Sequence, residues 1–359
     1  MSANIGCINV GLDHFHCRYD HSALSSETML SPVTSPFEDA LAALRISGSV
    51  LLHECYRPPW AIEVPDERQL QKLLGAKSDV RVLPFHLVRH GSFVLHHDGL
   101  EPIDVETNDV VICTGGKRHR MAFGAKSEAV SLADILSGEA DRREVASVAR
   151  DKRTTELICG VFLLRSVPLN PMLAALPPVL KLRTAGDDAS PLLMRVAESL
   201  GEELALGHRS SFTALRLLEV FCAAAISQHR RAEGQHLPGW FKALDDPKIG
   251  SAMARIHQNP GAPWTVALLA EAVAMSPSRF AARFRETTRQ SAMAYVTRWR
   301  MSVACRLLRE TELALPEIAA EIGYQDTAAF SRAFKALVGQ SPSPWRQQTR
   351  LRSNTFPAA

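Results

Sequence analysis

The sequence predicts an α+β protein with an antiparallel β-barrel domain first, a helical segment after it, and an all-α carboxy-terminal domain of two helix-turn-helix units. Three patterns support this fold class. Short β-prone runs lie between residues 50 and 164, amphipathic helical patterns cover 191–229, and two diverged copies of a helix, a tight turn and a second helix lie at about 264–346. The 359 residues, 46% of them hydrophobic, can bury the cores of two or three compact units.

The amino-terminal domain is predicted to follow a flexible tail at residues 1–35, a stretch rich in Ser, His and small residues without a helical or strand period. Met29 in this tail is a candidate natural start. Residues 36–44 predict a short amphipathic helix. The β-prone runs that come next are separated by Gly, Pro or Asp, and they are residues 50–55, 80–88, 92–95, 109–113 and 156–164. Short strands with this spacing favour an antiparallel barrel or jelly roll.

Two amphipathic patterns, at residues 191–206 and 211–229, predict a pair of helices that forms a segment at 190–230. Such a pair can pack on its own barrel or against a second subunit. After it, residues 231–243 are polar around glycine and proline, which predicts a linker.

The carboxy-terminal domain, predicted at residues 244–350, has matching helix signals in its two copies. Thr265, Ser276 and Asp326 can each accept a backbone N–H as a helix N-cap. In the second helix of each copy, two phenylalanines four residues apart share one face, which must be the buried one. These pairs are Phe280 with Phe284 and Phe330 with Phe334.

The opposite faces of these helices carry short polar and guanidinium side chains, which can read base edges in the major groove. The residues expected to meet bases are Ser278, Arg279, Ala282, Thr327, Ala328, Ser331 and Arg332. Candidates for phosphate contacts or helix-flanking salt bridges are Arg283, Arg285, Arg298 and Lys335. Residues 294–308 predict one long helix between the copies, which would set the two reading helices roughly 34 Å apart, about one turn of DNA.

Charge supports the assignment to DNA binding. Residues 248–352 contain 15 Lys and Arg against 7 Asp and Glu, a net charge of +8. The remainder, with 26 basic and 31 acidic residues, has a net charge of −5, so a basic block is attached to a mildly acidic body. Basic residues can also simply solvate helix faces. Beside the tandem motif, however, they indicate phosphate binding that weakens with salt.

The carboxy-terminal hundred residues closely resemble the DNA-binding domain of the AraC/XylS family of bacterial transcription regulators. The residues that carry the resemblance are Trp299-Arg300-Met301, Ala304, Leu307-Leu308, Ile318-Ala319, Gly323-Tyr324, Phe330 to Lys335, Gly339, Ser341-Pro342 and Trp345-Arg346. One departure is Arg289, which stands where the family usually has glycine and must bear a positive φ or alter the turn. The resemblance implies a promoter site in double-stranded DNA and RNA polymerase as partners. Because the family mostly activates, an activator is expected.

Residues 36–185 resemble the cupin-like amino-terminal domain found on one branch of that family. The resemblance lies in residues 56–65, Phe85 to Val88 with Gly91, Asp109-Val110-Val111, Gly115 or Gly116 with His119, Cys159-Gly160, and Leu173 to Pro178. In that family, helices at the position of 190–230 pair two subunits, which implies a homodimer. The domain would then sense a small-molecule or metal signal.

The barrel contains candidate metal ligands. Cupins often bind a metal through inward histidines, and His86 and His119 fall on the matching strands, while Cys159 can supply a thiolate and Cys113 is near His119 in sequence. A mixed His and Cys set would suit zinc, which makes zinc the candidate cofactor. The alternative is that these residues are hydrogen-bonded or apolar core residues.

A second function class is a metal-dependent cupin enzyme that carries a DNA-binding tail. The sequence lacks the HxH pair with a following glutamate that such enzymes use, so we expect no enzyme activity and no catalytic residue. A third interpretation makes the barrel a dimerisation scaffold that senses nothing.

Arg57 and Trp60 are candidates for binding a small organic effector near the barrel mouth, although a tryptophan buried in the core explains the pattern equally well. The seven cysteines are odd in number and scattered, which favours reduced thiols. No apolar run is long enough to span a bilayer, so a cytoplasmic protein without membrane contact is expected.

Overall fold

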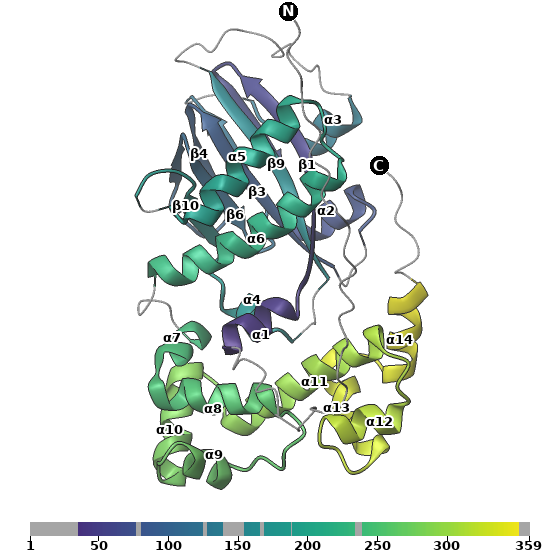
Figure 1. Ribbon diagram of the computed structural model, residues 1–359. Coiled ribbons are helices and arrows are strands. Elements are labelled where there is room, and N and C mark those ends of the chain that lie inside the picture. Colours follow the sequence, from purple (N-terminus) through teal and green to yellow (C-terminus); the bar gives the residue numbers. More distant parts are fainter. Residues whose placement is uncertain are drawn as a thin grey trace, which may run out of the picture. The chain divides into compact units, whose positions relative to one another are not determined.

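The computed structural model describes residues 35–76, 80–124, 128–138, 154–165, 169–187, 189–233 and 239–351. From Ser35 onward the chain forms one compact unit. All of the predicted tail except its last residue lies outside the described residues. The described part of the chain begins with helix α1 (Pro36–Ala42). It continues through ten strands with three short helices among them, and then forms helices only (Figure 1).

The first sheet has five antiparallel strands in the order β1-β9-β3-β6-β10. They are β1 (Arg45–Tyr56), β9 (Thr155–Arg165), β3 (Val80–His90), β6 (Asp109–Cys113) and β10 (Val179–Arg183). Four of them contain predicted β-prone runs, and β6 coincides with residues 109–113. The fifth, β10, alternates buried and exposed residues over only five positions, and the sequence analysis missed it.

The second sheet has the order β5-β4-β7-β2-β8. Its strands are β5 (Ile103–Glu106), β4 (Ser92–His97), β7 (His119–Phe123), β2 (Trp60–Val64) and β8 (Val130–Ser131). The two strands β2 and β8 are parallel, and the other pairs are antiparallel. Of these strands only β4 was predicted. The others have five residues or fewer and, unlike the equally short β6, contain no run of consecutive β-branched residues.

Of the two predicted architectures, an antiparallel barrel or a jelly roll, a closed barrel is not observed: the described strands form two separate five-stranded sheets, as a jelly roll does. The chain crosses between the two sheets several times, and one of these crossings, from β3 to β4, is at Gly91. This residue has φ +78°, and an added Cβ would lie 2.4 Å from the backbone oxygen of Thr154. A sharp turn that requires glycine therefore redirects the chain, instead of continuing one hydrogen-bonded ladder around a barrel.

The alternation of residues along β3 separates two cores. Leu83, Phe85 and Leu87 face the cluster formed with the long helices, whereas Val82 and Val88 belong to the cluster that also contains residues of the second sheet. His86 has the same parity as Val82 and Val88, so it faces the space between the two sheets.

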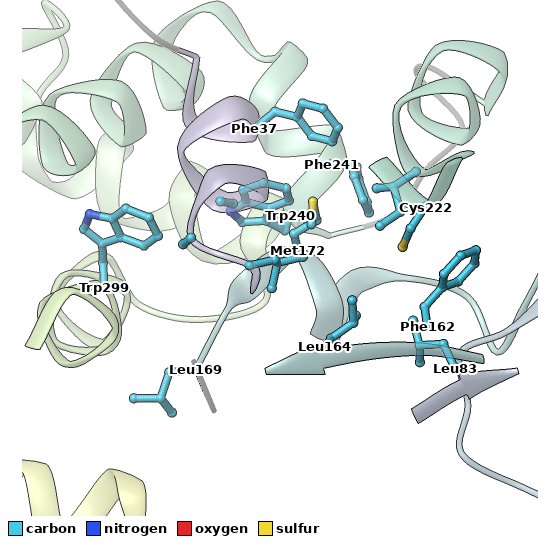
Figure 2. Packing of buried hydrophobic residues seen from close by; sticks show 14 of the residues in the cluster. Phe37, Leu83, Phe162, Leu164, Leu169, Met172, Cys222, Trp240, Phe241 and Trp299 are labelled. Atoms are coloured by element: carbon cyan, nitrogen blue, oxygen red, sulfur yellow. The ribbon is translucent and has the colours of Figure 1, made fainter. Parts of the chain in front are cut away.

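The outer face of the first sheet is covered by α5 (Pro191–Ala205) and α6 (Phe212–Glu233), close to the predicted ranges (Figure 1). Figure 2 shows Phe162 and Leu83 of the sheet with Cys222 of α6 in the same cluster. Three smaller helices complete this part of the chain: α2 (Glu67–Leu73), α3 (Leu132–Ser137) and α4 (Pro171–Ala175). The first sheet therefore packs on α5 and α6 while its inner face meets the second sheet.

The carboxy-terminal part is all helical, as predicted. Its helices are α7 (Trp240–Asp245), α8 (Pro247–Gln258), α9 (Val266–Ala272), α10 (Pro277–Thr288), α11 (Ala292–Glu310), α12 (Leu315–Glu321), α13 (Thr327–Val338) and α14 (Pro342–Leu351). Its core contains Phe280, Phe284, Phe330 and Phe334, each fully buried as the four-residue spacing predicted.

Part of the predicted linker, residues 231–243, is helical. The described portion of this range includes the end of α6 and most of α7. In α7, Trp240 and Phe241 are buried (Figure 2). The Trp240 indole N–H donates to the Tyr295 hydroxyl over 3.0 Å. Two aromatic side chains that enter a core require an ordered backbone, which explains the helix. Within the described ranges, no helix is long and apolar enough to cross a membrane.

Candidate nucleic-acid interface and interior histidine site

The first helix-turn-helix unit consists of α9 and α10. Thr265 caps α9 by accepting the backbone N–H of Leu268 over 3.1 Å. The turn between the helices contains Ala274 at φ +51°, and α10 ends at Arg289 with φ +61°. The expectation that Arg289 would bear a positive φ is confirmed. Both residues therefore occupy a left-handed conformation that favours glycine.

The second unit, α12 and α13, has glycine at the equivalent turn. Gly323 has φ +79°, and an added Cβ would lie 2.4 Å from the backbone oxygen of Gly261. Asp326 caps α13 by accepting the backbone N–H groups of Ala328 and Ala329, each over 3.0 Å. These two hydrogen bonds stabilise the carboxylate and lower the pKa of Asp326.

The predicted reading faces lie on the side of α10 and α13 away from the buried phenylalanines. Exposed side chains on these two helices include Ser278, Arg279, Ala282, Arg285, Ala328, Arg332 and Lys335. Thr327 and Ser331 are partly exposed, and so is Arg283. Arg298 is exposed on α11. Each reading helix therefore presents small polar groups and at least one guanidinium outward.

Arg283 has an ion-pair partner within the chain. Its Nε donates to Asp246 Oδ2 over 2.7 Å, and Asp246 also caps α8. Burial acts to raise the pKa of Asp246, but hydrogen bonds from the Ile249 backbone, the Arg283 guanidinium and the Lys248 backbone outweigh it and lower that pKa. Of the two roles expected for Arg283, the structure provides the helix-flanking salt bridge.

The two units are joined through α11 and the loop before α9. Arg300 of α11 donates to the backbone oxygens of Pro260 and Ala262 over 2.8 and 2.7 Å. Its guanidinium also lies 5.9 Å from the ring centroid of Tyr324 in the second turn. One side chain of the spacer helix therefore contacts segments that flank both units.

A buried aromatic and histidine network supports the spacer helix, and the sequence analysis missed it. His257 of α8 stacks on Trp299 with ring centroids 3.6 Å apart and is hydrogen-bonded to the Tyr295 hydroxyl at 2.7 Å. His257 Nδ1 also lies 3.4 Å from a carboxylate oxygen of Asp39 in α1. Burial lowers the pKa of His257 although Asp39 acts to raise it. A lone histidine on an amphipathic helix gives no sequence signal for such a network.

Between the two sheets lies a group of three buried potential ligands: His86 on β3, Cys113 on β6 and His119 on β7. One ligand atom from each lies within 4.8 Å of the other two. The two imidazoles are in direct contact, with 2.8 Å between their Nε2 atoms. Of the predicted ligands, the structure therefore brings His86 and His119 together.

Burial determines the protonation of this group. It lowers the pKa of His86 well below its ordinary value, and the neighbouring His119 lowers it further. Burial also lowers the pKa of His119 to about 4, helped by His97 and opposed by a hydrogen bond with the Lys117 backbone. Burial raises the pKa of the Cys113 thiol to about 12. At neutral pH the group therefore holds two neutral imidazoles and a protonated thiol.

Cys159, predicted as the third ligand, is in register with His86 across the β3–β9 pair but does not belong to this group of three. Cys113 does, because β6 lies on the other side of β3 and Cys113 faces the same interior. His97, the last residue of β4, is also buried and in register with His119. His97 lies at the same alternate positions of β4 as the buried Phe93 and Leu95, so its side chain points to the same inner face.

The two residues predicted to bind an organic effector do not share an environment. Trp60 is buried, with its ring centroid 5.2 Å from that of Tyr56 and 6.1 Å from that of Phe93. Arg57 is exposed. Trp60 thus acts as part of the core between the sheets, the alternative weighed from the sequence.

Comparison with known proteins gives two family matches. The Cupin family model matches residues 35–229, and the Helix-turn-helix domain model matches 269–348. A putative AraC-like transcription regulator of Streptomyces antibioticus is 32% identical over 318 residues, which cover 87% of this chain and 98% of that protein. The chain belongs to the AraC-like transcription regulators.

Two further relatives align with parts of this AraC-like regulator. The RCS-specific HTH-type transcriptional activator RclR of Escherichia coli is 30% identical over 104 residues, 29% of this chain and 37% of RclR. Among solved structures, the DNA-binding domain of AdpA in complex with a target DNA is 26% identical and covers 31% of this chain and 99% of that chain, with a TM-score of 0.30. The regulator is therefore a DNA-binding transcriptional regulator of AraC type with a cupin amino-terminal part.

Proposed function

We propose that the protein is a transcriptional activator that binds a promoter site through two adjacent major-groove segments and responds to a signal in its cupin part. The observation that carries the DNA-binding half is the pair of outward faces on α10 and α13, each opposite two fully buried phenylalanines. Residues 278, 279 and 282 would meet bases in one segment, and residues 327, 328, 331 and 332 in the other.

Arg332 provides the sharpest test of base reading. Its guanidinium is exposed on α13, and we expect Arg332→Ala to weaken binding to the specific site by about 1–3 kcal/mol while non-specific binding changes little. Lys335→Ala, one turn further along, is the matched control. If Lys335 contacts a phosphate, its removal should weaken binding to all DNA sequences alike and reduce the salt dependence of the affinity. Fluorescence anisotropy at two salt concentrations measures both. If Arg332→Ala weakened binding to specific and random DNA equally, Arg332 would be a phosphate contact.

Activation is proposed from the family and from RclR, whose name describes an activator. In vitro transcription with purified RNA polymerase, on a promoter that the protein binds specifically, tests this proposal. More transcript with the protein than without it is the expected result, and less transcript would make the protein a repressor.

We also propose that α5 and α6 pair two copies of the chain. Among the described residues, several large apolar side chains on or beside these helices are exposed: Leu192, Leu206, Phe212, Leu215 and Val220. A groove at these helices is lined by the apolar residues Leu192, Val220, Ala223 and Ala224 and by the polar residues Ser190, Glu219, Ser227 and Arg231. Exposed apolar side chains gathered beside polar ones are typical of an interface between subunits.

Sedimentation velocity of the double variant Phe212→Glu, Val220→Glu tests the pairing. A dimer should become a monomer, because two carboxylates would be buried without partners. Leu100→Glu, at an exposed leucine outside these helices, is the control and should leave the dimer intact. If both variants sediment like the unmodified chain, the interface lies elsewhere.

The signal of the cupin part is proposed to be a small molecule or a metal ion, and the protein is proposed not to be an enzyme. The group of His86, Cys113 and His119 includes no carboxylate that could serve as a catalytic acid or base, which disfavours the metal-dependent enzyme. A thermal-stability screen of the full chain against metabolites and metal ions tests the sensor, since a ligand that binds the native state raises the midpoint temperature. No shift across the panel would favour a scaffold.

A further inference from the structure

We propose that His86, His119 and Cys113 bind one soft monovalent cation, copper(I), as a three-coordinate site of two imidazoles and one thiolate. This inference specifies the signal class of the proposed sensor. It rests on that proposal for its link to transcription, but the binding itself can be measured without DNA.

The three donors come from both sheets and meet in the interior. His86 and Cys113 lie on neighbouring strands of the first sheet, and His119 faces them from the second. All three side chains are at least 97% buried in the interior. Their convergence in one place requires strands that are distant in sequence, so it is a product of the fold.

The contact between the two imidazoles leaves polar atoms poorly satisfied. One proton can bridge the two Nε2 atoms, so in the neutral pair one ring donates and the other accepts. In that state His86 Nδ1 has no hydrogen-bond partner among the described residues. Buried polar atoms without partners are uncommon in proteins and point to a missing ligand or ion.

A cation at this place would be bound by the two Nε2 lone pairs. An ion about 2 Å from each nitrogen needs them farther apart than the observed 2.8 Å, so the rings would part slightly. A small cavity bordered by His86, Met121 and Cys159, with room for about one water molecule, provides space for this movement.

The strand order limits the number of thiolates to one. Cys113 on β6 and Cys159 on β9 lie on opposite sides of β3. Neighbouring strands are about 4.8 Å apart, so two strand spacings separate the backbones of these cysteines by roughly 10 Å. The two sulfurs of a single tetrahedral site would be less than about 4 Å apart, with zinc–sulfur bonds near 2.3 Å. A site with two histidines and two cysteines, the usual neutral zinc site, is therefore disfavoured.

The net charge of the buried complex then favours a monovalent ion over a divalent one. With one thiolate and neutral imidazoles, a divalent ion would leave a net charge of +1 in an interior formed by Phe93, Leu95, Val111 and Met121. A buried charge without a counter-ion costs several kcal/mol or more. A monovalent ion replaces the thiol proton of Cys113 and gives a complex with no net charge, and the displaced proton leaves to solvent. Thiolate and imidazole donors are also the ligands that copper(I) prefers.

The test is an anaerobic titration of the full chain with copper(I) in competition with a chromophoric copper(I) chelator. Cys7 and Cys17 lie outside the described residues, so the titration uses the Cys7→Ser, Cys17→Ser background to remove their thiols. In this background Cys113→Ser should weaken copper(I) binding by at least about 100-fold. Cys159→Ser is the matched control, because that thiol is equally buried beside His86 but outside the group, and affinity should stay within about threefold.

The coordination shell distinguishes the ions. X-ray absorption of the copper(I) form should show one sulfur and two nitrogen neighbours, and a parallel zinc titration should give weaker binding. Equal losses from Cys113→Ser and Cys159→Ser, or two sulfur neighbours, would overturn the proposed site. Zinc binding tighter than copper(I) relative to standard chelators would overturn the choice of ion.

Circular dichroism of each apo variant verifies folding, and His119→Gln provides a second ligand variant if Cys113→Ser unfolds. DNA binding by the metal-free protein tests the regulator independently.

Discussion

At the residue scale, the two turns show how similar geometry can be reached with different side chains. Gly323 adopts its positive φ at no cost, whereas Ala274 and Arg289 adopt theirs against the preference of any residue with a Cβ. The positive φ of Arg289 was predictable, because the resemblance placed glycine there. That of Ala274 was not predicted, because an alanine at a helix end carries no signal.

We therefore predict that Ala274→Gly raises the free energy of unfolding of the full chain by about 0.5–1 kcal/mol, since relief of the left-handed strain exceeds the entropy that glycine adds to the unfolded state. Ala281→Gly, in the interior of α10, should have the opposite sign and lower it by about 1 kcal/mol. Urea denaturation followed by tryptophan fluorescence measures both. Destabilisation by both substitutions would mean that Ala274 is not strained.

The interior site was also partly predictable from single residues. His86 and His119 were identified from the strands on which they lie, but Cys159 was chosen over Cys113. Sequence order could not decide between the two cysteines, because the choice depends on which strand lies on which side of β3. Sheet order is set by pairing between distant segments, which a linear pattern does not record.

At the scale of elements, long patterns were predicted well and short ones poorly. The helices α5, α6 and α11 agree with their amphipathic patterns, and β6 agrees with its β-prone run. The strands β2, β5, β7 and β10 are as short as β6 but lack its run of consecutive β-branched residues, so their pairing partners decide whether they form. Helix α7 forms where a linker was predicted. Its burial against Tyr295 outweighs the effect of the glycine and proline before it, which favour a linker.

Helix α8 provides a prediction that depends on pH. Asp246 caps it and pairs with Arg283, and its pKa is lowered from 3.8, so its carboxylate stabilises the fold above pH 4 and this contribution is lost as the pH falls through the lower folded-state pKa. At pH 7 Asp246→Ala should lower the free energy of unfolding by about 1–2 kcal/mol. Asp246→Asn, which keeps a capping side chain, should cost less than about 1 kcal/mol.

The pH dependence separates the charge from the cap. The difference in free energy of unfolding between the unmodified chain and Asp246→Asn should shrink as the pH falls below 4, because the unfolded chain then binds a proton at Asp246 that the folded carboxylate does not. Urea midpoints measured from pH 7 to pH 3 test this, and a difference that is constant over the range would show that the ion pair contributes nothing.

At the scale of the whole molecule, domain type and family could be predicted from the sequence because tandem motifs and long periodic segments determine them. The arrangement of two sheets, in contrast, depends on pairing between distant strands and on close approaches such as that of the Thr154 backbone to Gly91. Contacts between residues far apart in the chain have no local signal. The same applies to the approach of His257 to Asp39, which are more than two hundred positions apart.

The loop before the first unit is in direct backbone contact with the turn of the second. An added Cβ on Gly261 would lie 2.5 Å from the backbone oxygen of Glu321, and the loop also accepts two hydrogen bonds from Arg300. The distance and rotation between the two predicted reading helices, α10 and α13, should therefore be fixed. One base pair inserted between the two bound segments turns the second by about 35° and moves it about 3.4 Å.

Such an insertion should reduce affinity to that of a single segment, and a full turn of inserted DNA should not restore it, because the span would then exceed the reach of α11. Gel-shift assays on sites with insertions of 1, 5 and 10 base pairs would measure this. Promoters controlled by this regulator should accordingly share one invariant gap, so a genome can be searched for its targets with a fixed-spacing pattern.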